Sequence, residues 1–197
     1  MVAKSKDELL EFEAFKKGSE KAMSLLDSLS KESDRGLALL ATAYIDKAME
    51  ELLVAFFLND KKICKSIFEG YSPLATFSSK IDISFLCGLI PVKAKQDLHL
   101  IRKIRNEFAH YPSEITFESA KIDKLCNQLY YDIFIGKISL RRKFQRCVLS
   151  ILGMINAETF SSKHRAKRAD INLEADEFKE LHRAMIETIN DAFEEGE

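Results

Sequence analysis

Hydrophobic residues recur every three or four positions over most of the chain, which is the spacing of a helix face. The clearest case is the segment 98–110, where Ile101, Ile104 and Phe108 fall on one side of a helix. The opposite side collects polar residues with the same period, namely His99, Arg102, Asn106 and His110, with Arg105 at the border. We therefore predict a helix that buries one face and presents chemically capable side chains on the other.

The same period predicts further helices over about 7–28, 33–58, 76–88, 120–129, 140–157 and 170–193. Ser33 or Asp34 is placed to cap the second of these, and Gly88 to end the third in a left-handed conformation. In the second helix we expect Leu37, Leu40 and Tyr44 to be buried. Only seven glycines and three prolines occur, and no strand-like alternation competes. The sequence predicts an all-α, single-domain multi-helix bundle over 1–197, with 137–197 as a charged helical extension.

Several classes of protein are disfavoured by the composition. The longest apolar run, 52–58, is far shorter than the roughly 20 residues of a membrane helix, and the first residues lack the features of a signal peptide. We expect a soluble, cytoplasmic protein without a membrane partner. The four cysteines form no Cys-x-x-Cys pair and are expected to be buried free thiols. We predict no metal site and no cofactor, since a Gly-rich phosphate loop is also missing from the sequence.

Charge is distributed unevenly over the last third of the chain. The segment 137–168 has nine Lys or Arg and one acid, a net of +8, whereas 174–197 has nine acids and two bases, a net of −7. Either the two segments attract each other or the basic one is a nucleic-acid interface. We favour the first, because the formal net charge of the chain is −1 and no helix-turn-helix turn is recognisable. The second would use Lys137, Arg141, Arg142, Lys143, Arg146, Arg165, Lys167 and Arg168.

Three segments together resemble the bacterial mannitol operon repressor family (MltR-like). They are SDRGLALLATAYID at 33–46, PLATFSSKI at 73–81 and IRKIRNEFAH at 101–110. The likeness is strongest over 33–129, and its structural motif residues are Asp34, Arg35 and Asp46. It implies an all-helical transcription regulator that exerts negative control over a sugar-alcohol operon without a standard DNA-binding motif. On this basis we expect a homodimer that contacts another regulatory protein.

The segment RNEFAH at 105–110 also resembles the Arg-x4-6-His signature of the HEPN superfamily, which includes metal-independent ribonucleases and inactive relatives. By resemblance, His110 would handle the proton of the RNA 2′-hydroxyl, Arg105 would stabilise the phosphorane and Asn106 would orient the phosphate. Imidazole titrates near neutral pH and guanidinium offers a fixed donor fork, so the chemistry is permitted. The alternative is structural, and we favour it: Arg105 pairs with Asp46 or Glu50, and His110 caps the helix end. A ribonuclease, or an inactive interaction or antitoxin module, is the alternative function.

Overall fold

The computed structural model describes residues 24–110, 115–132, 138–170, 172 and 174–194. Residues 24–30 are helical, and the helices that follow are α2 (Asp34–Phe56), α3 (Lys61–Ile67), α4 (Phe77–Leu86), α5 (Val92–His110), α6 (Ala120–Cys126), α7 (Leu140–Ser161) and α8 (Asp176–Glu194). No strand occurs in these ranges, so the all-α prediction is confirmed. The helix predicted over 7–28 lies mostly outside the described residues.

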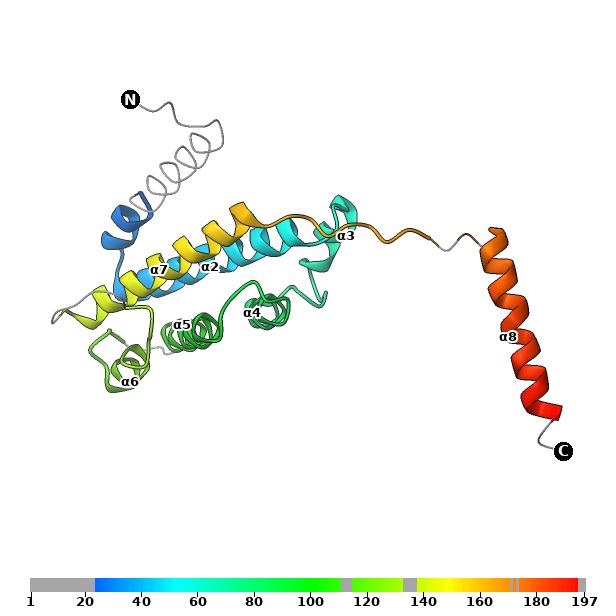
Figure 1. The fold of residues 1–197 in the computed structure, drawn as a ribbon. Coiled ribbons are helices and arrows are strands. Elements are labelled where there is room, and N and C mark those ends of the chain that lie inside the picture. The colour runs from blue at the N-terminus through cyan, green and yellow to red at the C-terminus, as the bar shows by residue number, and fades with distance from the viewer. Residues whose placement is uncertain (1–23, 111–114, 133–137, 171, 173, 195–197) are drawn as a thin grey trace, which may run out of the picture. The chain divides into compact units, whose positions relative to one another are not determined.

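The chain forms two compact units, Met1–Arg165 and Ala166–Glu197. In the first, α2 is the central helix and packs against α7, α5 and α4. Figure 1 shows α2 and α7 side by side, with α4, α5 and α6 in a second layer. The second unit contains α8. Whether the whole chain acts as the predicted single domain stays a prediction.

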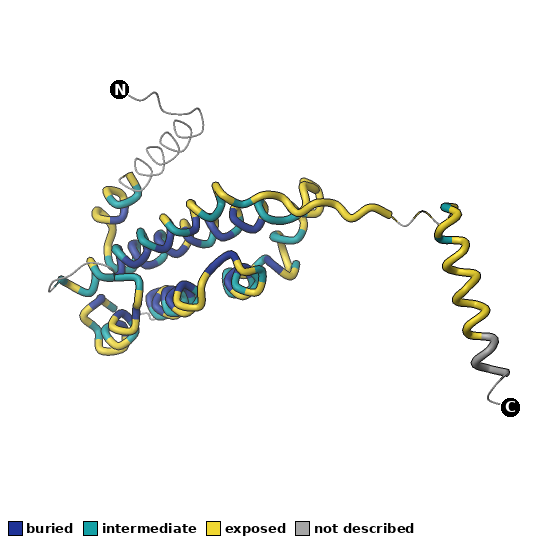
Figure 2. The backbone as a smooth tube through the Cα atoms, viewed as in Figure 1, coloured by how far each residue is buried: buried dark blue, intermediate teal, exposed yellow. Residues whose placement is uncertain are grey.

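The hydrophobic core lies where the inner faces of α2, α7 and α5 meet (Figure 2). Ile101, Ile104 and Phe108 are fully buried, as the helical period predicts. The Phe108 ring lies 5.0 Å from that of Phe117, which lies 5.3 Å from that of Phe144, measured between ring centroids. These aromatic contacts join α5, the segment before α6, and α7.

The ends of the helices follow the local sequence. Ser33 Oγ accepts a hydrogen bond from the Gly36 amide at the start of α2, and Thr76 Oγ1 accepts one from the Ser79 amide at the start of α4. Gly88 has a φ of 74°, a left-handed conformation that costs glycine little and ends α4 as predicted.

Other expectations need correction. Tyr44 is 47% exposed, because the buried side of α2 is centred near Ile45 and a residue one position away points about 100° from that centre. Leu40 is only partly buried. Helix α7 continues to Ser161, and α8 begins at Asp176 rather than near 170. Two of the four cysteines are buried and two are partly exposed.

Candidate functional site

A polar pocket of about 350 Å³ lies between α2, α4 and α5. Helix α5 contributes Arg102, Arg105 and Asn106, which belong to the polar arc predicted from the sequence. Helix α2 contributes Thr42 and Asp46 to a second wall, and the first residues of α4 form the third. The structure therefore brings part of the HEPN-like motif to a concave site.

The two pocket arginines have few partners. Arg105 is exposed, and its Nη1 donates a hydrogen bond of 3.0 Å to Asn106 Oδ1, its neighbour on the same helix. The Nε of Arg102 is buried and has no hydrogen-bond partner within the described part of the chain. Neither arginine forms an ion pair with a carboxylate of the described residues. Both guanidinium groups thus retain donors for another molecule.

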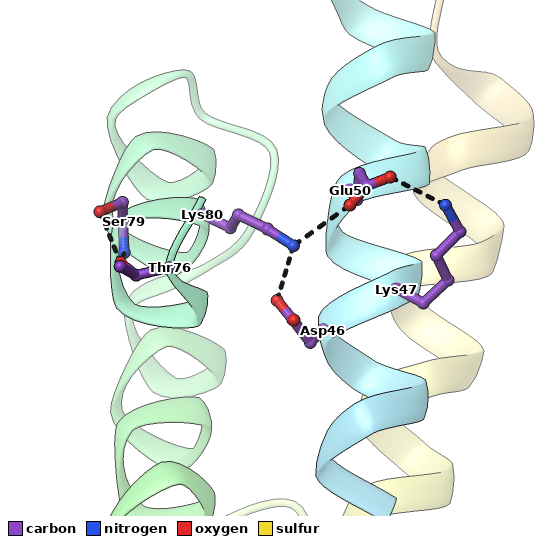
Figure 3. A network of polar contacts seen from close by, with 6 residues as sticks. All are labelled: Asp46, Lys47, Glu50, Thr76, Ser79 and Lys80. Atoms are coloured by element: carbon purple, nitrogen blue, oxygen red, sulfur yellow. Dashed lines mark hydrogen bonds and ion pairs between the residues drawn. The ribbon is translucent and has the colours of Figure 1, made fainter. Parts of the chain in front are cut away.

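Lys80, and not Arg105 as predicted from the sequence, pairs with Asp46 and Glu50 of α2. Its side chain is 5% exposed and extends from α4 to α2 (Figure 3), where Nζ lies 2.9 Å from Asp46 Oδ1 and 3.3 Å from Glu50 Oε2. The first contact is an ion pair without hydrogen-bond geometry, and the second is a hydrogen bond. The expected pairing of Arg105 with these acids is therefore wrong, because α4 packs directly against α2 and brings Lys80 to them.

Glu50 is shared between two lysines, since Lys47 Nζ also lies 2.8 Å from Glu50 Oε1. Burial acts to raise the pKa of Glu50, but the hydrogen bonds and charges of Lys47 and Lys80 outweigh it and hold that pKa below its usual range. The hydrogen bond to Glu50 likewise raises the pKa of Lys47. The pocket thus borders a charge network whose carboxylates are already paired with lysines.

His110 is the last residue of α5 and does not line the pocket. Its side chain is exposed, and residues 111–114 lie outside the described part. The pocket therefore unites Arg105 and Asn106 of the HEPN-like motif without its histidine. Catalysis by Arg105, Asn106 and His110 stays a prediction.

The basic residues predicted to bind nucleic acid are distributed over different environments. Arg141 donates from Nη1 to Asp34 Oδ1 and from Nη2 to the Glu32 and Leu29 carbonyls. Asp34 Oδ2 also accepts from the Phe117 amide at 2.9 Å. Arg141 therefore holds the start of α2 against α7.

Among the other basic positions, the Arg165 guanidinium lies 5.0 Å from the centre of the Phe56 ring, and the Arg165 amide donates to the Phe56 carbonyl. Lys167 and Arg168 are exposed in the second unit, and Lys137 lies outside the described residues. Arg141 and Arg165 thus take part in contacts within the fold. The binding of nucleic acid by the set stays a prediction.

Sequence reasoning missed Asp97, a buried acid on α5. Its carboxylate accepts hydrogen bonds from the amides of Tyr130 and Tyr131 at 2.9 and 2.8 Å, and Cys147 Sγ lies 3.4 Å from Oδ2. Burial raises the pKa of the Cys147 thiol strongly, and Asp97 raises it further. An isolated acid next to Leu98 on the apolar side of a helix is the signal that could have revealed this structural contact.

No protein-family model matches this chain, and no curated protein sequence matches it. A solved structure has the same fold. It is a chain of the MtlR–HPr complex from Escherichia coli, with a TM-score of 0.59 and 16% sequence identity. The likeness covers 68% of this chain and 98% of that chain. At this identity the likeness shows the fold alone.

The described residues also limit other kinds of site. None of their helices combines the length and the apolar composition needed to cross a membrane. Within the same ranges, no three His, Cys, Asp or Glu side chains are grouped so that they could hold a metal ion.

Proposed function

We propose that the protein is a regulator that exerts negative control over transcription of a sugar-alcohol operon of the mannitol type, through contact with another protein. The observation that carries the proposal is the fold shared with a chain of the MtlR–HPr complex. The three sequence segments that resemble the mannitol operon repressor family support the same assignment. HPr, or a protein like it, is the first partner to test.

The environment of the basic residues favours a protein partner over DNA. Arg141 and Arg165 are engaged within the fold. Helix α7 runs unbroken from Leu140 to Ser161 and packs along α2 as part of the core. These two arginines are therefore held by contacts within the fold rather than left to bind phosphates of DNA.

We further propose that the protein is a homodimer and that α8 contributes to its interface. Leu181, Met185 and Ile189 are exposed at spacings of four, and form one apolar stripe on a helix of 19 residues. Such a stripe is self-complementary, so two copies of α8 can cover each other while their acidic faces stay in water. The acidic opposite face disfavours an anionic membrane or a nucleic acid as the partner.

The regulatory proposal is tested by deleting the gene and measuring transcripts of the mannitol-type operon, together with calorimetric titration of the purified protein with HPr. We expect raised transcripts and direct binding. A gel-shift assay with the operon promoter at physiological salt should show no complex. Unchanged transcripts in the deletion strain would contradict the regulatory proposal, and a specific shift without HPr binding would contradict the protein-contact mechanism.

The dimer is tested by light scattering after size-exclusion chromatography. The wild type should have twice the mass of one chain, and Met185→Glu should shift it toward the monomer. Arg183→Gln is the matched control, because it makes the same change in charge on the polar face of α8 and should stay dimeric. A monomeric wild type, or equal dissociation of both variants, would refute the proposed interface.

A further inference from the structure

We propose that the pocket between α2, α4 and α5 binds a small molecule that carries a phosphate group, with Arg102 and Arg105 as its anion ligands. The inference goes beyond the regulatory function, because it assigns a ligand site that protein–protein contact does not require. It rests on the charges, the unsatisfied donors and the size of the pocket.

The charge balance of the pocket calls for an anion. Arg102 and Arg105 are three residues apart on α5, so their side chains are neighbours and their positive charges repel. The one acid in the pocket wall, Asp46, is paired with Lys80. Two guanidinium groups therefore share the pocket without a carboxylate of the described residues to neutralise them. An anion with several oxygens would relieve this repulsion.

An unsatisfied donor supports the same assignment. The Nε of Arg102 is buried and lacks an acceptor among the described residues. Arg102 as a whole is only half-buried and lines the pocket, so its terminal Nη donors can reach a ligand, and an anion bound there would offset part of the cost of the unpaired Nε. Asn106 Oδ1 already accepts from Arg105, which leaves the Asn106 amide nitrogen as a further donor.

The start of α4 adds to this set of donors. Phe77 and Ser78 line the pocket, and as the first two residues of α4 their amides have no acceptor within the helix. The helix dipole also favours negative charge at this end. Two arginines, one amide side chain and one helix start together suit a tetrahedral anion better than a single carboxylate.

The size of the pocket distinguishes a small molecule from a bare ion. Its volume of about 350 Å³ falls at the lower end of the range for small-molecule sites. The wall also includes polar groups beyond the arginines, such as Ser78 and Asp46, which can contact hydroxyl groups of a ligand. A phosphate monoester of a small polyhydroxylated molecule therefore fits best, and free phosphate shares the same anion chemistry.

The test is calorimetric titration of the full chain with inorganic phosphate, glycerol phosphate and glycerol, at constant ionic strength set with chloride. We expect both phosphate compounds to bind and glycerol not to bind. Tighter binding of glycerol phosphate would identify an ester as the ligand, and equal binding would identify free phosphate. Tighter binding of a single-stranded RNA oligonucleotide than of glycerol phosphate would overturn the small-molecule assignment.

Variants locate the binding in the pocket. Arg102→Gln and Arg105→Gln should each lower the affinity about tenfold or more, the effect of losing a charge-assisted hydrogen bond. Lys103→Gln is the matched control, because Lys103 is exposed on the same helix, does not line the pocket and loses the same charge. Arg102→Lys keeps the charge but removes the planar pair of guanidinium donors, and should still lose affinity. Thermal melts without ligand establish that each variant is folded.

Absence of phosphate binding by the folded wild type would overturn the proposal, as would an equal loss of affinity in Lys103→Gln. Neither result would affect the regulatory proposal, because operon transcripts and HPr binding are measured without a pocket ligand. Conversely, failure to bind HPr would leave the phosphate titration interpretable.

Discussion

Replacement of Lys80 by methionine removes the ammonium group that joins α4 to α2 and leaves an unbranched side chain in its place. The Lys80 side chain is 5% exposed and lies between Asp46 and Glu50, with Nζ 5.8 Å from the centre of the Phe68 ring. The variant therefore keeps most apolar contacts of the lysine stem. It tests how much of the stability of this helix pair comes from charge.

The expected loss can be bounded from the exposure of the acids. Removal of one partner of a buried ion pair costs about 3–5 kcal/mol. The Asp46 and Glu50 side chains are 36% and 27% exposed, so water screens their charges, and Glu50 keeps its hydrogen bond to Lys47. We therefore expect Lys80→Met to lower the free energy of unfolding by about 2 kcal/mol at neutral pH.

The loss should depend on pH. The pKa of Glu50 is lower in the folded chain than its usual value, so its contribution to stability is complete above the unfolded pKa and disappears as the pH falls. Lys80 supplies part of that lowering. The difference between wild type and Lys80→Met should therefore be constant above about pH 5.5 and shrink as the pH falls below about 4.5.

Urea unfolding followed by far-UV circular dichroism measures both effects. Lys47→Met is the matched control, because Lys47 contacts the same glutamate from the surface and should cost less than about 1 kcal/mol. In the double variant Lys80→Met/Glu50→Gln the loss should be smaller than the sum of the two single losses. A loss below about 0.5 kcal/mol at neutral pH, or one that does not change with pH, would refute the reasoning.

Three further predictions concern other parts of the structure. Arg105→Ala should change the free energy of unfolding by less than about 1 kcal/mol in urea titrations, because the described hydrogen bond of Arg105 is local and exposed. A larger loss would contradict the assignment of Arg105 to ligand binding rather than to stability. Burial raises the pKa of Cys126 to about 12 and that of Cys147 further, so these thiols should react with a thiol reagent only after unfolding, and fast labelling of either would contradict the assigned burial. If the chain binds nucleic acid, Arg142→Ala/Lys143→Ala should lower both the affinity and its salt dependence in filter-binding assays, and unchanged binding would place the interface elsewhere.

Periodicity predicted well what depends on one helix alone. The burial of Ile101, Ile104 and Phe108 follows from their spacing, and Gly88 ends α4 because of its own conformational freedom. The predicted burial of Tyr44 was wrong, because a residue at the border of a helix face is exposed or buried according to which neighbouring elements cover it.

Contacts between helices were harder to predict than the helices themselves. The choice of Lys80 over Arg105 as the partner of Asp46 depends on how α4 and α5 are placed against α2, which a helical period does not specify. The polar arc of α5 did indicate the pocket, since it included Arg102 and Asn106. The third wall of the pocket is the start of α4, and the pattern of α5 alone does not predict that this segment lies beside it.

The ion pair of Lys80 and the proposed anion site are coupled through Asp46, which lines the pocket and contacts Lys80. While Lys80 neutralises Asp46, the two pocket arginines attract an external anion. Asp46→Asn removes the only negative charge among the pocket-lining residues, so phosphate should bind more tightly than to wild type. Lys80→Met leaves Asp46 without its lysine and should weaken phosphate binding. Calorimetric titration of both folded variants measures this opposition, and a shift of affinity in the same direction for both would show that the pocket does not select its ligand by charge.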